Sequence, residues 1–164
     1  MPVRTLFLLL AIGVPLLPSR PAAAQTAGAR EAAVLAVAHR ALEAISREDM
    51  VAFTDLLLED AWIYAVDGPP GGSEVRGRPR ARERAAALDV DIEERGFGGE
   101  VRVAGRMATV WLPYDLYVDG AWSHCGVDTF ILLEVGTEWR IASLAYTVEQ
   151  PPACRPHPDG PPGL

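Results

Sequence analysis

Apolar and polar residues alternate most clearly between residues 122 and 148, where the pattern predicts two strands joined by a turn. Gly136 lies in the turn, where glycine adopts a positive φ freely. Because both faces of these strands are largely apolar, we expect one face to cover the core and the other to be covered by a partner subunit or a tail. The first strand divides into two sets: His124, Gly126, Asp128, Phe130 and Leu132 on one face, and Cys125, Val127, Thr129, Ile131 and Leu133 on the other.

The exceptions to the apolar pattern are His124 and Asp128, four residues apart on the same face. A carboxylate on an otherwise buried strand is unfavourable unless it is paired or neutral. The expected neighbours of Asp128 are Gly126, Phe130 and, across the turn, Ala145, and none of them is a charge partner. We therefore expect burial to raise the pKa of Asp128 above the ordinary value of about 3.9. A neutral carboxyl at this position would donate a hydrogen bond to a ligand carbonyl.

The rest of the chain predicts three helices before a run of antiparallel strands. An apolar stripe marks the first helix, Asp49 is a suitable N-cap for the second, and Asp119-Gly120 is typical of a two-residue hairpin turn. Helices on one side of a curved antiparallel sheet make an α+β domain, a half-open cone with a cavity. The predicted elements are helices over 29–47, 50–58 and 79–90, strands over 61–66, 100–104 and 107–118, and a loop over 67–77.

The N-terminus has the organisation of a secretory signal peptide. Arg4 gives a basic start, residues 5–17 are apolar, and residues 22–24 (AAA) form a small-residue cleavage site before Gln25. A membrane anchor would need about 20 apolar residues, and this run is shorter and interrupted by proline. We therefore predict a periplasmic or secreted protein with a signal peptide over 1–24, a single domain over 27–150 and a Pro-rich disordered tail over 151–164, without a membrane attachment after cleavage.

The charge of the chain excludes two classes of partner. The whole sequence has 15 Lys and Arg against 22 Asp and Glu, and none of the basic residues is lysine. Removing Arg4 and Arg20 with the signal peptide leaves 13 against 22, a net charge of −9. An acidic chain without basic runs is not expected to bind nucleic acid or an anionic membrane surface.

Two cysteines, Cys125 and Cys154, are present in a chain expected in an oxidising compartment. Pairing the strands about Gly136 places Cys125 opposite Val148, and the prolines after it could turn the tail back toward this strand. A bridge of this size would stabilise the fold by roughly 3 kcal/mol. The alternative is two free thiols, and both possibilities remain open at this point.

Several motifs together resemble the nuclear transport factor 2-like superfamily, in its SnoaL-like, bacterial secreted branch. They are Glu48-Asp49 followed by residues 56–61 (LLLEDA), and residues 123–130 (SHCGVDTF) followed by residues 139–143 (WRIAS). With the order of elements, the resemblance covers about residues 29–148. It implies the cone fold described above, but not an activity, because the superfamily includes ketosteroid isomerases, polyketide cyclases, dehydratases and transport factors.

The ketosteroid isomerases of this superfamily allow a comparison by residue. Asp128 followed by Phe130 is similar to their Asp on the second-last strand, which is held protonated and donates to an oxyanion. The position of their catalytic phenol falls on Ala41, and that of their general base falls on Ala65. Asp67 could replace the base only if the loop shifts by two residues. Steroid isomerase chemistry is therefore not expected.

A second constellation follows from the turn at Asp119-Gly120. Two-residue pairing sets Asp115 opposite His124 and Trp111 opposite Asp128. A histidine oriented by a carboxylate is suited to act as a general base near neutral pH. Pro113 indicates a bulge, and if the bulge lies between Pro113 and the turn, Tyr114 points inward instead of Asp115. The alternative to a catalytic role for the His124 and Asp115 pair is a hydrogen bond that only stabilises the hairpin.

Three functions remain open. The first is binding of a small, mostly apolar molecule in the cone; the second is a cofactor-independent isomerase, lyase or hydrolase that uses His124, Asp128 and Asp115 as acid and base. The third is a dimeric interaction module with a cavity filled by Trp62, Tyr64 and Phe97. We expect no cofactor, and no metal because no two histidines have ligand spacing. The expected ligand-binding aromatic residues are Trp62, Tyr64, Trp111, Tyr114 and Phe130.

We also expect a homodimer. Without a partner, the outer face of the last hairpin would leave a large apolar patch exposed. A cover formed by the tail is the alternative. The residues assigned to this face are Val127, Ile131, Leu133, Ala142, Leu144 and Tyr146.

Overall fold

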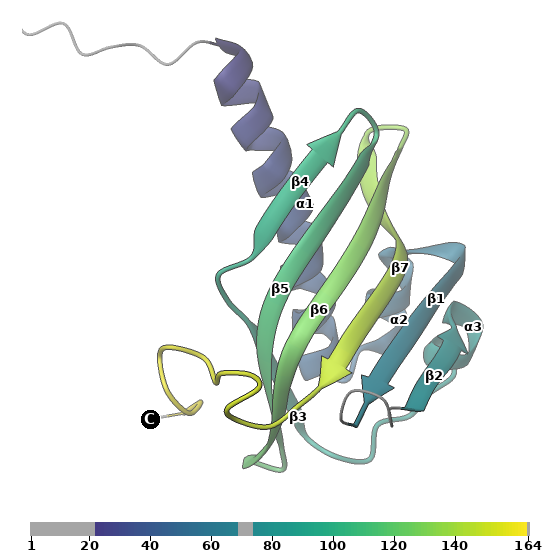
Figure 1. Ribbon diagram of the computed structural model, residues 1–164. Coiled ribbons are helices and arrows are strands. Elements are labelled where there is room, and N and C mark those ends of the chain that lie inside the picture. Colours follow the sequence, from purple (N-terminus) through teal and green to yellow (C-terminus); the bar gives the residue numbers. More distant parts are fainter. Residues whose placement is uncertain (1–21, 69–73, 164) are drawn as a thin grey trace, which may run out of the picture.

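The computed structural model describes residues 22–68 and 74–163, with three helices on one side of a curved seven-stranded sheet (Figure 1). The strand order is β2-β1-β7-β6-β5-β3, and β4 pairs with β5 beyond the end of β3. Neighbouring strands are antiparallel except β1 and β7, which are parallel. The helices are α1 (Ala22–Ser46), α2 (Met50–Asp55) and α3 (Arg80–Arg84), and the strands are β1 (Leu57–Asp67), β2 (Glu74–Pro79), β3 (Ile92–Gly96), β4 (Glu100–Ala104), β5 (Met107–Val118), β6 (Ala121–Val135) and β7 (Glu138–Val148).

The core lies between helix α1 and the inner face of the sheet. Val34, Ala38 and Ala41 are fully buried along one side of α1, as their spacing predicts. They belong to one apolar cluster with Leu112 and Phe130 of the central strands. The predicted α+β cone is therefore confirmed.

Two segments differ from the sequence prediction. The expected loop over 67–77 contains most of β2, and the helix expected over 79–90 is only the five residues of α3, followed by β3. Pro79 ends β2 and is the N-cap of α3 instead of lying in its first turn. Both missed strands lie at edges of the sheet, and β2 carries mostly exposed polar side chains, so neither shows an apolar alternation. Residues 69–73 of the expected loop lie outside the described residues.

The second helix begins as predicted and ends early. The Asp49 side chain accepts a hydrogen bond from the backbone N–H of Ala52 at 2.8 Å, which confirms the N-cap. The helix ends at Asp55, and β1 starts at Leu57 instead of residue 61.

Two bulges set the final register of the last three strands. Tyr117 pairs with Trp122 as a two-residue turn requires, but Leu116 pairs with His124, which leaves Ser123 as an extra residue in β6. A second shift, at Ala142, lies between β6 and β7. Beyond each bulge the pairing is displaced by one residue, and such a displacement exchanges the two faces of a strand.

The displaced register corrects four predicted pairs, and one of them is that of Cys125, which lies opposite Glu149 and not Val148. Asp115 lies opposite Cys125 and not His124, and Trp111 lies opposite Thr129. Across β7, the residue opposite Asp128 is Tyr146 and not Ala145. The predicted bulge exists, but it lies in the partner strand of Pro113, nearer the turn.

The tail after β7, which was predicted to be disordered, lies against the domain and contacts it at several residues. Cys125 and Cys154 form a disulfide with Cα atoms 5.7 Å apart, which confirms the predicted pair. The backbone N–H of His157 donates to Asp115 at 2.9 Å, and its ring meets the edge of Phe97 at 5.2 Å between centroids. These contacts cover part of the sheet face that lies away from α1.

The predicted signal peptide falls almost entirely on residues 1–21, outside the described residues. Helix α1 begins at Ala22, within the expected cleavage site. No helix in the described part of the chain is long and apolar enough to cross a membrane. The disulfide is consistent with an extracytoplasmic location.

Candidate functional site

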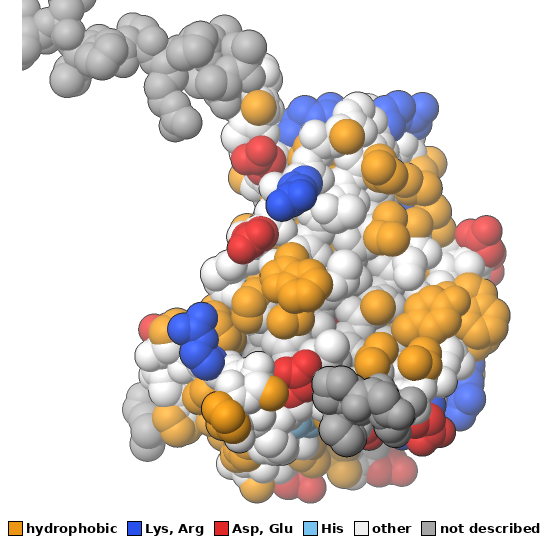
Figure 2. All heavy atoms as spheres, in the orientation of Figure 1, with side chains coloured by type: hydrophobic (Ala, Val, Ile, Leu, Met, Phe, Trp, Pro, Cys, Tyr) orange, Lys and Arg blue, Asp and Glu red, His pale blue; other side chains and the backbone are white. Residues whose placement is uncertain are grey.

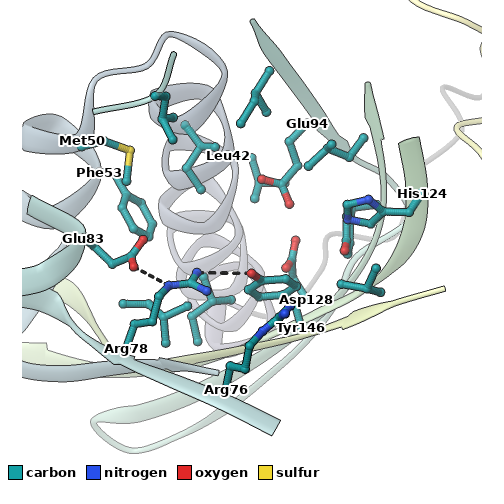
Figure 3. Close-up of a pocket in the computed structure, with 18 of the residues that line it drawn as sticks. Leu42, Met50, Phe53, Arg76, Arg78, Glu83, Glu94, His124, Asp128 and Tyr146 are labelled. Carbon is teal, nitrogen blue, oxygen red and sulfur yellow. Dashed lines mark hydrogen bonds and ion pairs between the residues drawn. The ribbon is translucent and has the colours of Figure 1, made fainter. Parts of the chain in front are cut away.

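A cavity of about 320 Å³ opens between the helices and the inner face of the sheet (Figure 3). This volume is at the lower end of the range typical of small-molecule sites. Most of its surface is apolar, with a smaller number of ionisable side chains projecting into it. The apolar wall includes Leu42, Ile45, Met50, Phe53, Ile63 and Leu144.

Asp128 of β6 forms the most buried polar part of the wall. Its side chain is 1% exposed, and its Oδ2 atom has no hydrogen-bond partner among the described residues. Burial raises the pKa of Asp128 well above its ordinary value, and the nearby Glu94 carboxylate raises it further. The predicted direction of the pKa shift is confirmed, but the nearest charge is a second acid, which the sequence did not indicate.

Glu94 of β3 is this second acid. Its backbone is fixed by Ser46 at the end of α1, whose Oγ accepts from the Glu94 N–H at 2.9 Å and donates to the Glu94 carbonyl at 3.3 Å. Its side chain projects into the cavity, and burial raises the pKa of Glu94 to about 7. No described side chain forms an ion pair or hydrogen bond with its carboxylate.

Two arginines of β2 line the opposite side, and each already has a partner. Arg78 forms an ion pair with Glu83 of α3 and donates to the Tyr146 hydroxyl at 3.2 Å. Burial alone would lower the pKa of Arg78, but the hydrogen bonds and charges of Tyr146 and Glu83 outweigh it and raise the pKa. Arg76 lies 3.7 Å from Asp67, near the end of β1.

His124 lies on the cavity wall, but its predicted carboxylate partner does not. The Nδ1 atom of His124 is 2.9 Å from the Ser123 hydroxyl, and the ring meets the edge of Tyr114 at 5.8 Å between centroids. Burial lowers the pKa of His124, and the charge of Asp67 opposes this only in part. No hydrogen bond joins His124 to Asp128 in the described residues, although both line the cavity.

Asp115 is on the other face of the sheet, so its predicted role as a catalytic partner of His124 is wrong. It is fully buried, where it accepts two hydrogen bonds from Arg95, at 3.0 and 2.7 Å, and one from the backbone of His157. The bulge at Ser123 is the physical cause, since it moves His124 to a position opposite Leu116. Asp115 holds the tail and β3 to the sheet.

Of the five predicted ligand-binding aromatic residues, only Tyr114 lines the cavity. It points inward, as the alternative register predicted, and its hydroxyl donates to the Thr147 carbonyl at 2.7 Å. Its partner across the ladder must be glycine, because a Cβ at Gly126 would lie 2.2 Å from the Thr147 carbonyl oxygen. Burial, and then the neighbouring acids, raise the pKa of Tyr114.

The other four lie elsewhere. Trp62 and Tyr64 are 44% and 37% exposed on the outer face, because alternation along β1 turns Ile63 into the cavity instead. Trp111 is 52% exposed, and Phe130 is fully buried in the core without lining the cavity. Trp62, Tyr64 and Phe97 do not line the cavity, so they do not fill it as the interaction-module alternative required.

The sequence did not indicate five ionisable residues of the cavity wall: Arg76, Arg78, Glu83, Glu94 and Tyr146. The two arginines are two residues apart, a spacing typical of one face of a strand, and this was the available signal. Tyr146 was assigned to the outer face because the bulge at Ala142 was not foreseen. Within the described ranges, no group of three or more His, Cys, Asp or Glu side chains is placed to hold a metal ion.

No family model and no curated protein matches the chain. Three solved structures are similar over most of their length. An NTF2-like protein of unknown function from Shewanella baltica has a TM-score of 0.56 and 17% identity, with coverage of 78% of this chain and 96% of that one. An NTF2-like protein from Silicibacter pomeroyi, also of unknown function, has a TM-score of 0.55 and 22% identity, with coverage of 75% of this chain and 98% of that one. An NTF2-like protein with a cystatin-like fold from Novosphingobium aromaticivorans has a TM-score of 0.58 and 16% identity, with coverage of 77% of this chain and 86% of that one.

The chain has a nuclear transport factor 2-like fold. At these identities the likeness concerns the fold alone. Ala41 and Ala65, the positions that the sequence comparison assigned to the phenol and base of a ketosteroid isomerase, are both fully buried. Asp67, the other candidate for a base, lines the cavity and is paired with Arg76.

Proposed function

We propose that the protein binds a small, mostly apolar molecule in the cone cavity, with the polar group of that molecule against Asp128. The observation that carries this proposal is the Oδ2 atom of Asp128, which is buried at the cavity wall without a partner. Buried polar atoms in folded proteins nearly always have a hydrogen-bond partner. A ligand in a mostly apolar cavity would supply the missing partner and gain from burying its hydrocarbon part.

A fragment screen with a cavity-filling variant tests the proposal. Leu144 is buried on the cavity wall, so Leu144→Trp should fill the space, whereas Leu133→Trp makes the same exchange on the outer face. Fragments that raise the melting temperature of the wild type should not do so for Leu144→Trp, and should still act on Leu133→Trp. Equal responses of the two variants would show that fragments bind elsewhere and would contradict the proposal.

Acid–base catalysis at the same site is the second candidate, as a cofactor-independent isomerase, lyase or hydrolase. It is favoured by the carboxyl of Glu94, whose pKa of about 7 suits proton transfer near neutral pH. His124 and Asp128 also line the cavity as acid–base groups. Glu94 would act as the third such group, because Asp115 lies on the other face of the sheet and does not line the cavity.

We further propose an exported homodimer of the SnoaL-like secreted branch. Export is supported by the sequence of residues 1–24 and by the disulfide. A dimer is supported by the apolar side chains on the outer sheet face, where Trp62, Tyr64, Trp111, Ile131 and Leu133 are all exposed (Figure 2). Of the residues first assigned to that face, Leu144 and Tyr146 instead line the cavity. A strict monomer at high micromolar concentration in sedimentation experiments would exclude the dimer.

A further inference from the structure

The charges around the cavity do not balance. Its wall carries four acids and two arginines, and the arginines pair with two of the acids, as Arg78 with Glu83 and Arg76 with Asp67. Among the described side chains, Glu94 and Asp128 are left without a cationic partner. A buried acid and a partly buried acid without a positive partner are unfavourable when both are ionised, so a cavity that retains them lacks one counter-charge.

The two unpaired acids converge on one space. Glu94 comes from β3 and Asp128 from β6, and their carboxyl groups point toward one another across the cavity (Figure 3). Glu94 is close enough to Asp128 for its charge to disfavour ionisation of the Asp128 carboxyl. Met50 and Phe53 lie across the cavity from the two acids and offer an apolar surface there, and Leu144 also lines the cavity.

We infer that the ligand is an apolar amine whose ammonium group binds between Glu94 and Asp128. This inference rests on the proposed binding function and names the chemical class of the ligand. An ammonium group has several N–H donors and no acceptor, so one ligand atom can satisfy both acids at once. The hydrocarbon part then lies against the apolar wall.

Other ligand classes fit the same site less well. An anion would need a cation, and Arg76 and Arg78 are both engaged in ion pairs. A carbonyl oxygen can accept a hydrogen bond from one protonated acid, but a single acceptor of this kind leaves the second acid without a counter-charge.

The pH dependence of binding separates an amine from a carbonyl ligand. As pH rises through about 7, Glu94 ionises and attracts a cation more strongly, while an alkylammonium stays protonated, as lysine does below about 10. Affinity for an amine should therefore rise with pH, and affinity for a carbonyl that needs a protonated acid should fall. The other ionisable groups facing this space are Asp67, Arg76, Arg78, Glu83, Tyr114, His124 and Tyr146. Burial lowers the pKa of His124, and loss of its proton as pH rises would remove a positive charge from the cavity, so it does not reverse the trend.

The test uses three probes with one carbon skeleton: aminotetralin, tetralol and tetralone, each substituted at the same ring position. Calorimetry on the disulfide-bonded protein at pH 8 should give an affinity for the amine at least about tenfold higher than for the alcohol or ketone. Glu94→Gln and Asp128→Asn should each reduce amine affinity by about tenfold and change alcohol affinity little. Both substitutions keep the side-chain shape. Glu93→Gln is the matched control, because Glu93 is exposed on the same strand and does not line the cavity.

The inference is overturned if the ketone binds more tightly than the amine, or if amine affinity does not rise between pH 6 and pH 8. Ketone binding that is lost in Leu144→Trp would leave the proposed binding function intact while excluding an amine. Failure of all three probes to bind would also overturn the inference. The fragment screen with Leu144→Trp and Leu133→Trp would then judge the proposed function separately.

Discussion

Asp115 and Asp128 lie on neighbouring strands of the same sheet, and both are almost completely buried, at 0% and 1% exposure. Asp115 has a bidentate arginine and a backbone N–H as partners, while one oxygen of Asp128 has none. Burial and residue type are therefore the same, and only the partners differ. Asp115 has a structural role, joining β3 and the tail to the sheet. Asp128 faces a cavity and is available to a ligand.

The largest expected effect comes from removing the partnered acid. Asp115→Ala leaves the Arg95 guanidinium, 19% exposed, without its carboxylate and releases the hydrogen bond to the tail. Loss of one member of a buried ion pair costs about 3–5 kcal/mol of unfolding free energy. Urea denaturation measures this directly, and Asp128→Ala should show no comparable loss. Similar losses in the two variants would mean that Asp128 has a partner in solution.

The second-largest loss of stability is expected from breaking the Cys125–Cys154 disulfide, which lies on the same face of the sheet as Asp115. Reduction of the Cys125–Cys154 bridge opens a loop with a sequence separation of 29. The chain-entropy model gives a loss of roughly 3–4 kcal/mol in unfolding free energy. Denaturation with and without a reductant tests this expectation, and an unchanged midpoint would contradict it. Asp115→Ala should reduce the further loss on reduction if both contacts hold the same tail.

The unpartnered acids predict the pH dependence of stability. A carboxyl with a raised folded-state pKa stabilises the fold fully below its unfolded-state pKa, and this contribution is lost as pH rises through the folded-state pKa. For Glu94 the window lies between about 4.5 and about 7, and for Asp128 it extends well above the ordinary value of 3.8. Glu94→Gln and Asp128→Asn should each flatten this decline, by about 1–2 kcal/mol across the window. Denaturation curves at several pH values measure the slope, and Glu93→Gln should leave it unchanged.

The smallest effect is expected at an acid that is satisfied but exposed to solvent. The Asp49 carboxylate caps α2 through the Ala52 N–H. Asp49→Ala should cost about 1 kcal/mol, since capping groups typically contribute this much. A loss as large as that of Asp115→Ala would show that α2, which supplies Met50 and Phe53 to the cavity, is stabilised mainly by its cap.

The fold was predictable where the apolar pattern is strong. The strand over 107–118 has the predicted bounds, and the disulfide and the turn at Asp119-Gly120 were also anticipated. Asp119 and Gly120 both have the positive φ that such a turn requires. Strands β2 and β3 were missed because edge strands exposed to solvent do not need alternating apolar residues.

The site was less predictable than the fold, for two reasons. A bulge adds one residue without a compositional signal, so the shifts at Ser123 and Ala142 reversed the assignment of Asp115 and Tyr146. The facing of Asp128 was predicted correctly because β6 has no bulge between Asp128 and the buried Phe130, so the two side chains stay on the same face. Glu94 could not be placed in the same cavity as Asp128 until β3 was known to be a strand.

The parallel pairing of β1 with β7 has a consequence for how the binding cavity forms. Leu57–Asp67 and Glu138–Val148 are distant in sequence, and their contact joins the β1–β2 hairpin to the rest of the sheet. Closing so long a loop makes this pairing slow compared with that of the adjacent hairpins. During synthesis, Ile63 and Arg78 cannot meet the wall that carries Leu144 and Tyr146 until the last strand of the domain has emerged. A folding intermediate that contains only the β5–β6 hairpin and α1 would therefore have a core but no ligand site.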